Sequence, residues 1–275
     1  RLGEALGIDP RYTGSLTLGG GTAGSILHLA AIAVNAGMAD YVACVFADAA
    51  ATGGSRFSRA SGWGDSYAIW GFMSACANSA ISASRHMALY GTTSRHLGEV
   101  AVACRKHASL NPHAVMRKPI TIEDHQSSRW IVKPLHLLDC CLISDGGVCI
   151  IVTTAERAAY RMAGVGARDI DVAQFYDNFS ISVILWLEHA GFCKPGEGGA
   201  FVEGGRIQLG GELPVNTAGG NLSESYMEGW LHVVEGVRQL RGECGVRQVP
   251  GAELCLVTGR GMSLNCANAT VLGKG

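Results

Sequence analysis

Two clusters of polar side chains follow stretches of the sequence that are predicted to be strands. The first is Phe-Tyr-Asp-Asn-Phe at residues 175–179, and the second runs from Asn216 to Gly229. In open α/β sheets, ligands bind at the carboxyl ends of strands. Each cluster would bring a tyrosine and an amide to such an end, so both are candidates for a binding or catalytic site. The alternative is that both are well-capped turns.

A glycine motif lies nearer the start of the chain, where Gly19-x-Gly21-x-x-Gly24 precedes a predicted helix and Asp48 follows the next predicted strand. This spacing matches the dinucleotide-binding fingerprint. No complete second nucleotide-binding half follows, so we favour a tight turn between a strand and a helix. Such a turn can still belong to an active site.

Composition excludes several classes of protein. Of 275 residues, 48% are hydrophobic and 16% are charged, which is too apolar for a disordered chain. The net charge of −1 gives no electrostatic footprint for nucleic acid. Residues 13–39 carry no Asp, Glu, Lys or Arg, but the apolar part, Ile26–Val34, is too short to span a membrane. The start of the chain is not typical of a signal peptide.

The ten cysteines contain no CxxC pair, which argues against a metal site and favours reduced, buried thiols in the cytoplasm. Glycine is abundant, with 38 residues, and indicates tight turns and close backbone approaches.

Apolar runs and turn signals predict two α/β halves. Residues 1–153 form the first half and include a helical cap insertion at about 51–130, and residues 154–275 form the second. We expect a strand–helix–strand unit at 13–50, with strands at 15–18 and 41–46, the latter buried. Further predicted strands are 148–153, 172–176, 252–258 and 267–272; further predicted helices are 80–90, 94–107, 180–190 and 228–241.

These blocks resemble the thiolase superfamily, in particular its branch of sterol-carrier and lipid-transfer thiolase-like proteins. The supporting blocks are Gly37–Asp40, Tyr90–Ser94, Ser144–Gly147, Gly196–Val202 and Leu213–Asn216. The resemblance covers essentially the whole chain. It implies a layered αβαβα fold with two related halves, here without the N-terminal part, and a homodimer.

All four catalytic elements of a thiolase are altered at the matching positions. The nucleophilic cysteine falls at Gly20, within one residue. The block that positions a catalytic water begins with Tyr176, and the histidine of the Gly-His-Pro block is Tyr226. The acid/base cysteine of the Cys-x-Gly block is Val257. Acyl transfer through a cysteine thioester therefore has no nucleophile at this site.

The two tyrosines resemble the pattern of the steroid side-chain-cleaving aldolases of this superfamily, which act with a DUF35 protein bearing an OB-fold. The resemblance implies retro-aldol cleavage of a β-hydroxyacyl-CoA steroid to a 17-keto steroid and propionyl-CoA. It also implies a heterotetramer with the DUF35 partner. The CoA thioester would be the substrate, with no cofactor and no metal.

We expect Tyr176 and Tyr226 to share the acid and base roles. A phenol has an ordinary pKa of about 10, so one of them must have a lowered pKa or relay its proton. Gly20 would leave room for the substituted carbon of the substrate. The other residues expected at the substrate are Asp177, Asn178, Asn216, Gly219, Gly220, Gly259 and Gly261, the last two through backbone donors. Asp177 and Asn178 could equally cap a helix.

Two other hypotheses stay open on the sequence. The chain could be a non-catalytic lipid- or acyl-CoA-binding subunit, in which the tyrosines only fill the space of lost catalytic groups. It could also be an acyltransferase that uses a displaced thiol such as Cys255.

Overall fold

The computed structural model describes residues 13–53, 74–153, 165–261 and 267–274, together with Gly7 and Pro10. The helices are α2 (Thr22–Asn35), α4 (Ala75–Tyr90), α5 (Ser94–Ser109), α6 (Ile122–Ser127), α7 (Ser180–His189), α8 (Gly198–Phe201), α9 (Gly220–Ser223) and α10 (Trp230–Arg241). The strands are β1 (Tyr41–Ala49), β2 (Trp130–Val132), β3 (Leu135–His136), β4 (Asp145–Thr153), β5 (Val172–Gln174), β6 (Leu254–Arg260) and β7 (Ala267–Gly273). Short 3-10 turns include η2 (Leu137–Asp139).

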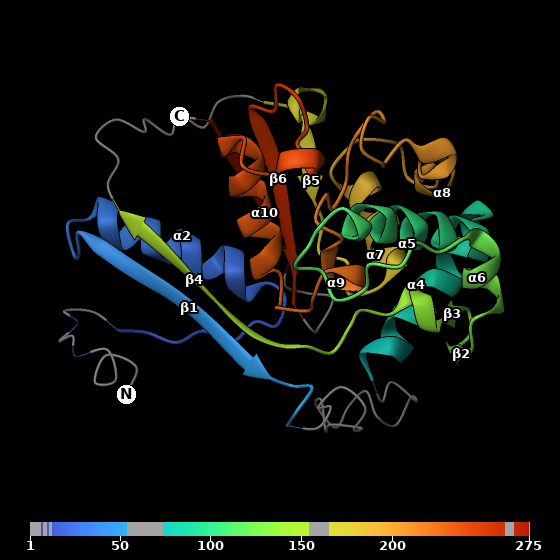
Figure 1. The fold of residues 1–275 in the computed structure, drawn as a ribbon, viewed down its shortest axis with the longest axis horizontal. Coiled ribbons are helices and arrows are strands. Elements are labelled where there is room, and N and C mark those ends of the chain that lie inside the picture. Colours follow the sequence, from blue (N-terminus) through green and yellow to red (C-terminus); the bar gives the residue numbers. More distant parts are fainter. Residues whose placement is uncertain are drawn as a thin grey trace.

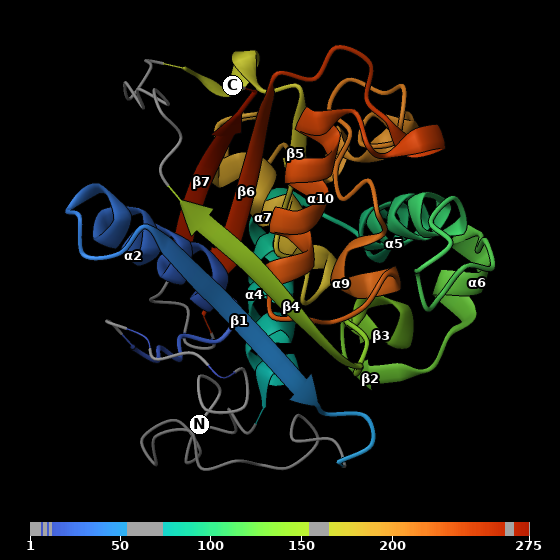
Figure 2. The same ribbon diagram turned by 60° about the vertical axis from the view of Figure 1, so that its left-hand side comes forward.

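The elements form successive layers of strand and helix (Figures 1 and 2). The ribbon β1–β4 packs on α2 and α10, which in turn cover one face of the sheet β5–β6–β7. The ring of Phe46 on β1 stacks on Trp230 of α10 with centroids 6.3 Å apart, which joins the first two layers. Helices α7, α4 and α5 share an apolar core with the other side of the sheet. The layered α/β fold expected from the sequence is confirmed.

The sheet β5–β6–β7 places the ends of two parallel strands side by side. Strand β5 pairs in parallel with β6, with Gln174 opposite Val257, and β6 pairs antiparallel with β7. Strand β5 is wholly buried and β6 nearly so, as their apolar runs predict. Because parallel strands end at the same edge, Tyr176 comes to lie beside Thr258.

The ribbon of β1 and β4 is antiparallel, with Tyr41 opposite Thr153. Exposure alternates along both strands. One face meets the helices, whereas the other carries Tyr41, which is 73% exposed, and Ile151, which is 65% exposed. The prediction that residues 41–46 form a buried strand is therefore right about the strand and wrong about its burial.

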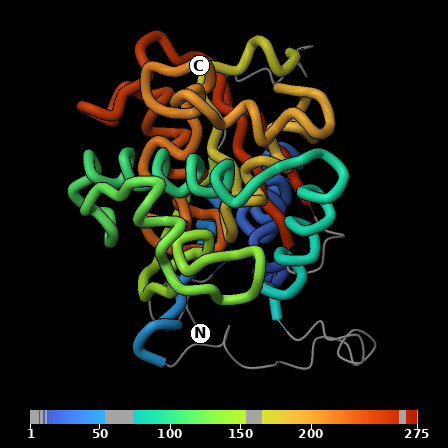
Figure 3. The backbone as a smooth tube through the Cα atoms, turned by 90° about the vertical axis from the view of Figure 1, so that its right-hand side faces the viewer, coloured from blue at the N-terminus to red at the C-terminus, as the bar shows by residue number. Residues whose placement is uncertain are grey.

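The helical region between the ribbon strands is closely joined to the rest of the fold. Helix α5 runs across the face seen in Figure 3 and contacts α6. Helix α5 begins at a capping box formed by Thr93 and His96, and it packs against α7 and α9. Residues 54–73 of the expected cap insertion lie outside the described residues.

Most predicted elements are present with shifted ends. The exception is the strand at 15–18, which is wrong: this stretch has no ladder and makes only a single bridge between Leu18 and Gly20. The unit predicted at residues 13–50 therefore consists of helix α2 and strand β1, without the strand expected before the helix. Helix α10 begins at Trp230, after two left-handed residues, Glu228 and Gly229, rather than at 228.

Candidate active site

The hydroxyl groups of Tyr176 and Tyr226 meet in the buried interior of the fold. Their hydroxyl oxygens lie 2.9 Å apart, which is a hydrogen bond that either phenol can donate. Tyr176 is 2% exposed and Tyr226 is 8% exposed. Fifty residues separate the two in the sequence, so the fold, rather than local structure, creates the pair.

Backbone contacts fix the position of Tyr176 just beyond the end of β5. Its N–H donates to the hydroxyl of Thr258 on β6 at 3.1 Å. Its ring lies directly over Gly20, where an added Cβ would be 2.1 Å from the ring carbon Cζ. A Cβ at Gly229 would lie 3.3 Å from the same ring. Glycine is thus required beneath the ring.

This contact corrects the expectation for Gly20. The space above Gly20 is filled by the ring of Tyr176 and is not open to a substrate. Gly259 also packs against this turn, since a Cβ there would lie 2.6 Å from the carbonyl oxygen of Gly20. Gly261 is buried at the end of β6.

Tyr226 is held by the segment that follows α9. Its N–H donates to the hydroxyl of Ser144 at 3.2 Å. Helix α9 is itself tied to Asp177, whose carboxylate accepts from the N–H groups of Asn221 at 2.8 Å and Leu222 at 3.2 Å. Because Asp177 follows Tyr176 directly, one buried carboxylate connects the segments that carry the two phenols.

Asp177 therefore has the helix-capping role that the sequence left open. It is fully buried and also accepts a hydrogen bond from Nε2 of His232 at 2.9 Å. A Cβ at Gly220 would lie 2.2 Å from its Oδ2, so Gly220 gives the carboxylate access to the helix. A Cβ at Gly219 would collide with Ala108 on α5 instead.

The side chain of Asn216 supports the backbone of Phe175. Its side-chain amide donates to the carbonyl oxygen of Phe175 at 2.9 Å and accepts from the N–H of Phe175 at 2.7 Å. Its backbone is left-handed, with φ 53°. These bonds give the Asn216 amide a structural role, and its contact with substrate stays a prediction. The amide oxygen of Asn178 is likewise engaged, by the hydroxyl of Ser182 in the first turn of α7 at 2.7 Å.

Burial controls the acidity of both phenols. It raises the pKa of Tyr176 and of Tyr226 well above the ordinary value of 10. The charge of the nearby Glu228 raises both further. Both tyrosines are therefore neutral at physiological pH, and the pair is suited to relaying a proton rather than to holding a phenolate.

Glu228 lies near the tyrosine pair and was not among the residues expected from the sequence. It has a left-handed backbone, with φ 46°, and such strain is common at functional sites. Burial is the main cause that raises the pKa of its carboxyl, and the charge of Asp48 on β1 adds to it. An acidic residue beside a glycine, two positions after Tyr226, was the available signal.

Cys255 lies away from the tyrosines in the core beneath α10. It is fully buried, and a Cβ at Gly236 would lie 3.0 Å from its sulfur. Burial raises the pKa of this thiol well above its ordinary value, which leaves it a poor nucleophile. The hypothesis of an acyltransferase that uses Cys255 has no support in this geometry.

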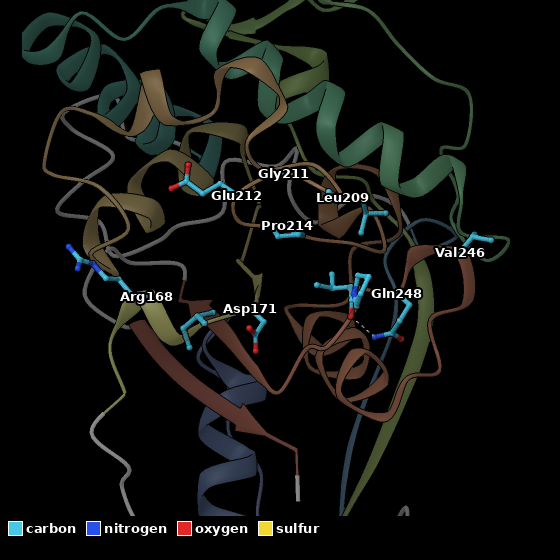
Figure 4. A pocket seen from close by; sticks show the side chains of 12 residues that line it. Arg168, Asp171, Leu209, Gly211, Glu212, Pro214, Val246 and Gln248 are labelled. Carbon is cyan, nitrogen blue, oxygen red and sulfur yellow. Dashed lines mark hydrogen bonds between the residues drawn. The ribbon is translucent and has the colours of Figure 1, made fainter.

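The hollow drawn in Figure 4 lies at the other end of β5 and is separate from the tyrosine pair. It is lined by Arg168, Asp171 and Glu212 among others. Asp171 precedes β5 and accepts hydrogen bonds from the N–H groups of Glu253 and Leu254, so it joins the strands β5 and β6. The tyrosine pair lies beyond the opposite end of the strand.

Two features are absent from the described residues. No helix among them is long and apolar enough to cross a membrane. In the same part of the chain, no group of three or more His, Cys, Asp or Glu side chains is arranged to hold a metal ion.

Comparisons with known proteins identify the family of this chain. The thiolase C-terminal domain-like family matches residues 148–274. A 17-hydroxy-3-oxo-4-pregnene-20-carboxyl-CoA lyase of Mycobacterium tuberculosis is 39% identical, over 94% of this chain and 81% of the relative. A steroid side-chain-cleaving aldolase of Thermomonospora curvata is 36% identical, over 82% of this chain and 71% of the relative.

Solved structures show the same relationship. The Ltp2-ChsH2(DUF35) aldolase superposes with a TM-score of 0.87 at 34% identity, covering 99% of this chain and 83% of that one. A monomeric SCP2-thiolase-like protein of Mycobacterium smegmatis, 16% identical with a TM-score of 0.67, shares the fold over 97% of this chain and 62% of its own. The chain therefore belongs to the thiolase superfamily and is one of its carbon–carbon lyases.

Proposed function

We propose that this chain cleaves the side chain of a 17-hydroxy steroid carried as a CoA thioester, by a retro-aldol reaction. The products are a 17-keto steroid and propionyl-CoA. The observation that carries the proposal is the 2.9 Å hydrogen bond between two neutral, buried phenols, one just beyond β5 and the other in the segment after α9. The named activities of the two curated relatives support the substrate class.

The tyrosine pair supplies the proton transfer that this reaction needs. The substrate hydroxyl gives its proton to one phenol, that phenol passes its own proton to the second, and the second releases its proton toward the α-carbon in the same step. The bond between the hydroxyl-bearing ring carbon and the α-carbon of the thioester breaks, and its electrons move into the developing enolate. The α-carbon takes up the proton that the second phenol releases. Both tyrosines end neutral, with the hydrogen bond between them reversed, so no phenolate accumulates.

The enolate oxygen also requires hydrogen-bond donors that are in place before the reaction. Backbone N–H groups near Gly259 and Gly261, at the end of β6, are our candidates for these donors. No covalent intermediate and no cofactor enters the scheme, since the CoA thioester is the substrate itself.

We propose that the chain assembles as a homodimer and joins a DUF35 protein in a heterotetramer. The structural relative that supports this is itself described as an aldolase with a DUF35 component. The outward face of the β1–β4 ribbon, with Tyr41, Val45 and Ile151 exposed, is the apolar surface suited to pairing two copies. Light scattering with and without the DUF35 protein would give the two masses, and a monomer in both would contradict this assembly.

Conservative replacement of each phenol tests the mechanism. In Tyr176→Phe and Tyr226→Phe the ring volume is kept while the hydroxyl is lost. Each should lower kcat by about 100- to 10,000-fold, the usual contribution of general acid–base catalysis. Tyr90→Phe is the matched control, because Tyr90 is 47% exposed on α4. Substrate binding should persist in all three variants.

The same assay distinguishes a lyase from the non-catalytic binding subunit. If the wild-type chain with its DUF35 partner binds the thioester but leaves it intact, the chain is a binding subunit. If both phenylalanine variants cleave at the wild-type rate, the tyrosine relay is wrong even though the lyase activity stands.

A further inference from the structure

A buried histidine that the proton relay does not use lies beside Tyr176. His232 is the third residue of α10 and is 2% exposed. The centroid of its ring lies 6.2 Å from that of the Tyr176 ring, and the two planes are tilted by 44°. Its Nε2 lies 2.9 Å from Oδ1 of Asp177, the residue that directly follows Tyr176. His232 is therefore placed to act on the phenols through this carboxylate.

The carboxylate of Asp177 collects hydrogen-bond donors from three helices. The N–H groups of Asn221 and Leu222 come from α9, at 2.8 and 3.2 Å. The thiol of Cys104 on α5 lies 3.8 Å from Oδ2, and a thiol is a weak donor. The fourth donor is the imidazole of His232 on α10. Within the described part of the chain, His232 thus makes the strongest side-chain hydrogen bond to this carboxylate.

The two ring nitrogens of His232 have different surroundings. An ionised carboxylate only accepts hydrogen bonds, so Nε2 carries the proton that is donated to Asp177. The other nitrogen, Nδ1, is buried and has no hydrogen-bond partner among the described residues. The ring is therefore anchored at Nε2 alone, and its polar connection to the tyrosine pair runs through Asp177.

We propose that His232 is a positioning residue for the proton relay between Tyr176 and Tyr226, an inference that rests on the proposed function. Its Nε2–H fixes the carboxylate of Asp177, which holds the N–H groups of α9 ahead of Tyr226. Without this donor a buried charge keeps fewer partners, which is costly, so the carboxylate turns away or takes up a proton. Either response loosens α9 and lengthens the 2.9 Å bond between the phenols.

Three replacements separate the donated hydrogen bond from other roles of the ring. His232→Gln keeps an N–H donor that can reach Asp177 but has no counterpart of Nδ1. His232→Asn is polar but ends one carbon earlier and falls short of the carboxylate. His232→Leu removes every polar atom of the side chain. His189→Leu makes the same change at an exposed position of α7 and is the matched control.

Steady-state kinetics with the steroid thioester and the DUF35 partner gives kcat and KM, with kcat expressed per folded protein from circular dichroism. His232→Leu and His232→Asn should lower kcat by about 10- to 100-fold, because a displacement of about 1 Å costs on the order of 100-fold. KM should not change, since the thioester is not bound by this ring. His232→Gln and His189→Leu should keep the wild-type kcat.

The split between kcat and KM separates positioning from a purely structural role. A residue that only stabilises the fold would lower the amount of folded protein and leave the kcat of the folded fraction unchanged. That result for His232→Asn and His232→Leu would overturn the proposal. A His232→Gln protein as slow as His232→Leu would also overturn it, because the donated hydrogen bond would then not be what matters.

Carbon-13 NMR of protein labelled at the Cζ of tyrosine reports on the phenols without substrate. The signals of Tyr176 and Tyr226 are assigned with the two phenylalanine variants. Both signals should shift in His232→Asn and His232→Leu, and neither should shift in His232→Gln or His189→Leu. Unshifted signals in all four proteins would overturn the proposal. If the wild type has no lyase activity, the proposed function fails, while these signals still decide whether His232 positions the phenols.

Discussion

Replacing Gly20 by alanine tests whether the position of Tyr176 depends on the missing side chain beneath its ring. A Cβ at position 20 would lie 2.1 Å from Cζ and 2.4 Å from Cε2 of Tyr176, and 2.5 Å from the carbonyl oxygen of Arg260. The ring and the backbone of β6 enclose this space together. The alanine therefore has no free direction, and the ring must move.

These distances give the movement that the Tyr176 ring must make. Increasing the separation from 2.1 Å to the 3.4 Å at which ordinary contact begins shifts the ring by about 1.3 Å. A comparable shift of the hydroxyl stretches the 2.9 Å bond to Tyr226 past the limit of a hydrogen bond. Misplacing a catalytic group by about 1 Å costs on the order of 100-fold in rate. That corresponds to about 2.7 kcal/mol in the activation free energy.

The assay measures kcat for cleavage of the steroid thioester and the free energy of unfolding in urea. Gly20→Ala should lower kcat by about 100-fold, and crowding should destabilise the fold by about 1–3 kcal/mol. Gly166→Ala is the matched control, since a Cβ there meets only Asp169 Oδ2 at 3.8 Å, an ordinary contact. A Gly20→Ala protein with wild-type kcat and stability would refute this account of how Tyr176 is positioned.

Three further predictions concern groups that support the surroundings of the tyrosine pair. Burial raises the pKa of Glu224 to about 8 from an ordinary 4.5. Its carboxyl therefore holds a proton more tightly in the folded protein than in the unfolded chain. The free energy of unfolding should fall as the pH rises from about 4.5 to 8. Glu224→Gln should flatten that fall in urea denaturation at several pH values, and an unchanged slope would contradict the assignment. Asn216→Ala loses both hydrogen bonds to Phe175 and should destabilise the fold by about 2–4 kcal/mol; a loss below about 1 kcal/mol in urea would count against its supporting role. Position 220 has a φ of 60°, and a Cβ there would lie 2.2 Å from Asp177. Gly220→Ala should therefore lower the free energy of unfolding by about 2–4 kcal/mol. An unchanged free energy of unfolding would show that the carboxylate is not held there.

Several parts of the structure could be predicted because they depend on local pattern. The apolar runs of β5 and β6 predict buried strands, and Gly91 and Gly242, both left-handed, mark the ends of α4 and α10. The strand expected at 15–18 fails for a different reason. An apolar, extended stretch becomes a strand only where a neighbouring strand can pair with it, and nothing local specifies that neighbour.

The predicted strand ends and the thiolase resemblance together predicted that Tyr176 and Tyr226 lie close together. They did not predict the structural roles of Asp177 and Asn216. A carboxylate or an amide in a turn has the same sequence whether it binds a ligand or backbone groups, and only the tertiary contacts decide. Glu228 was missed because nothing local predicts a left-handed conformation at a glutamate.

Cleavage in deuterium oxide without added CoA tests the central claim most directly. The complete chain and a DUF35 partner would be incubated with the tertiary β-hydroxyacyl-CoA steroid, and the products would be weighed by mass spectrometry. The relay between Tyr176 and Tyr226 predicts a 17-keto steroid and propionyl-CoA that carries one deuterium at its α-carbon. Cleavage that requires free CoA, or a protein that gains the mass of an acyl group, would contradict it.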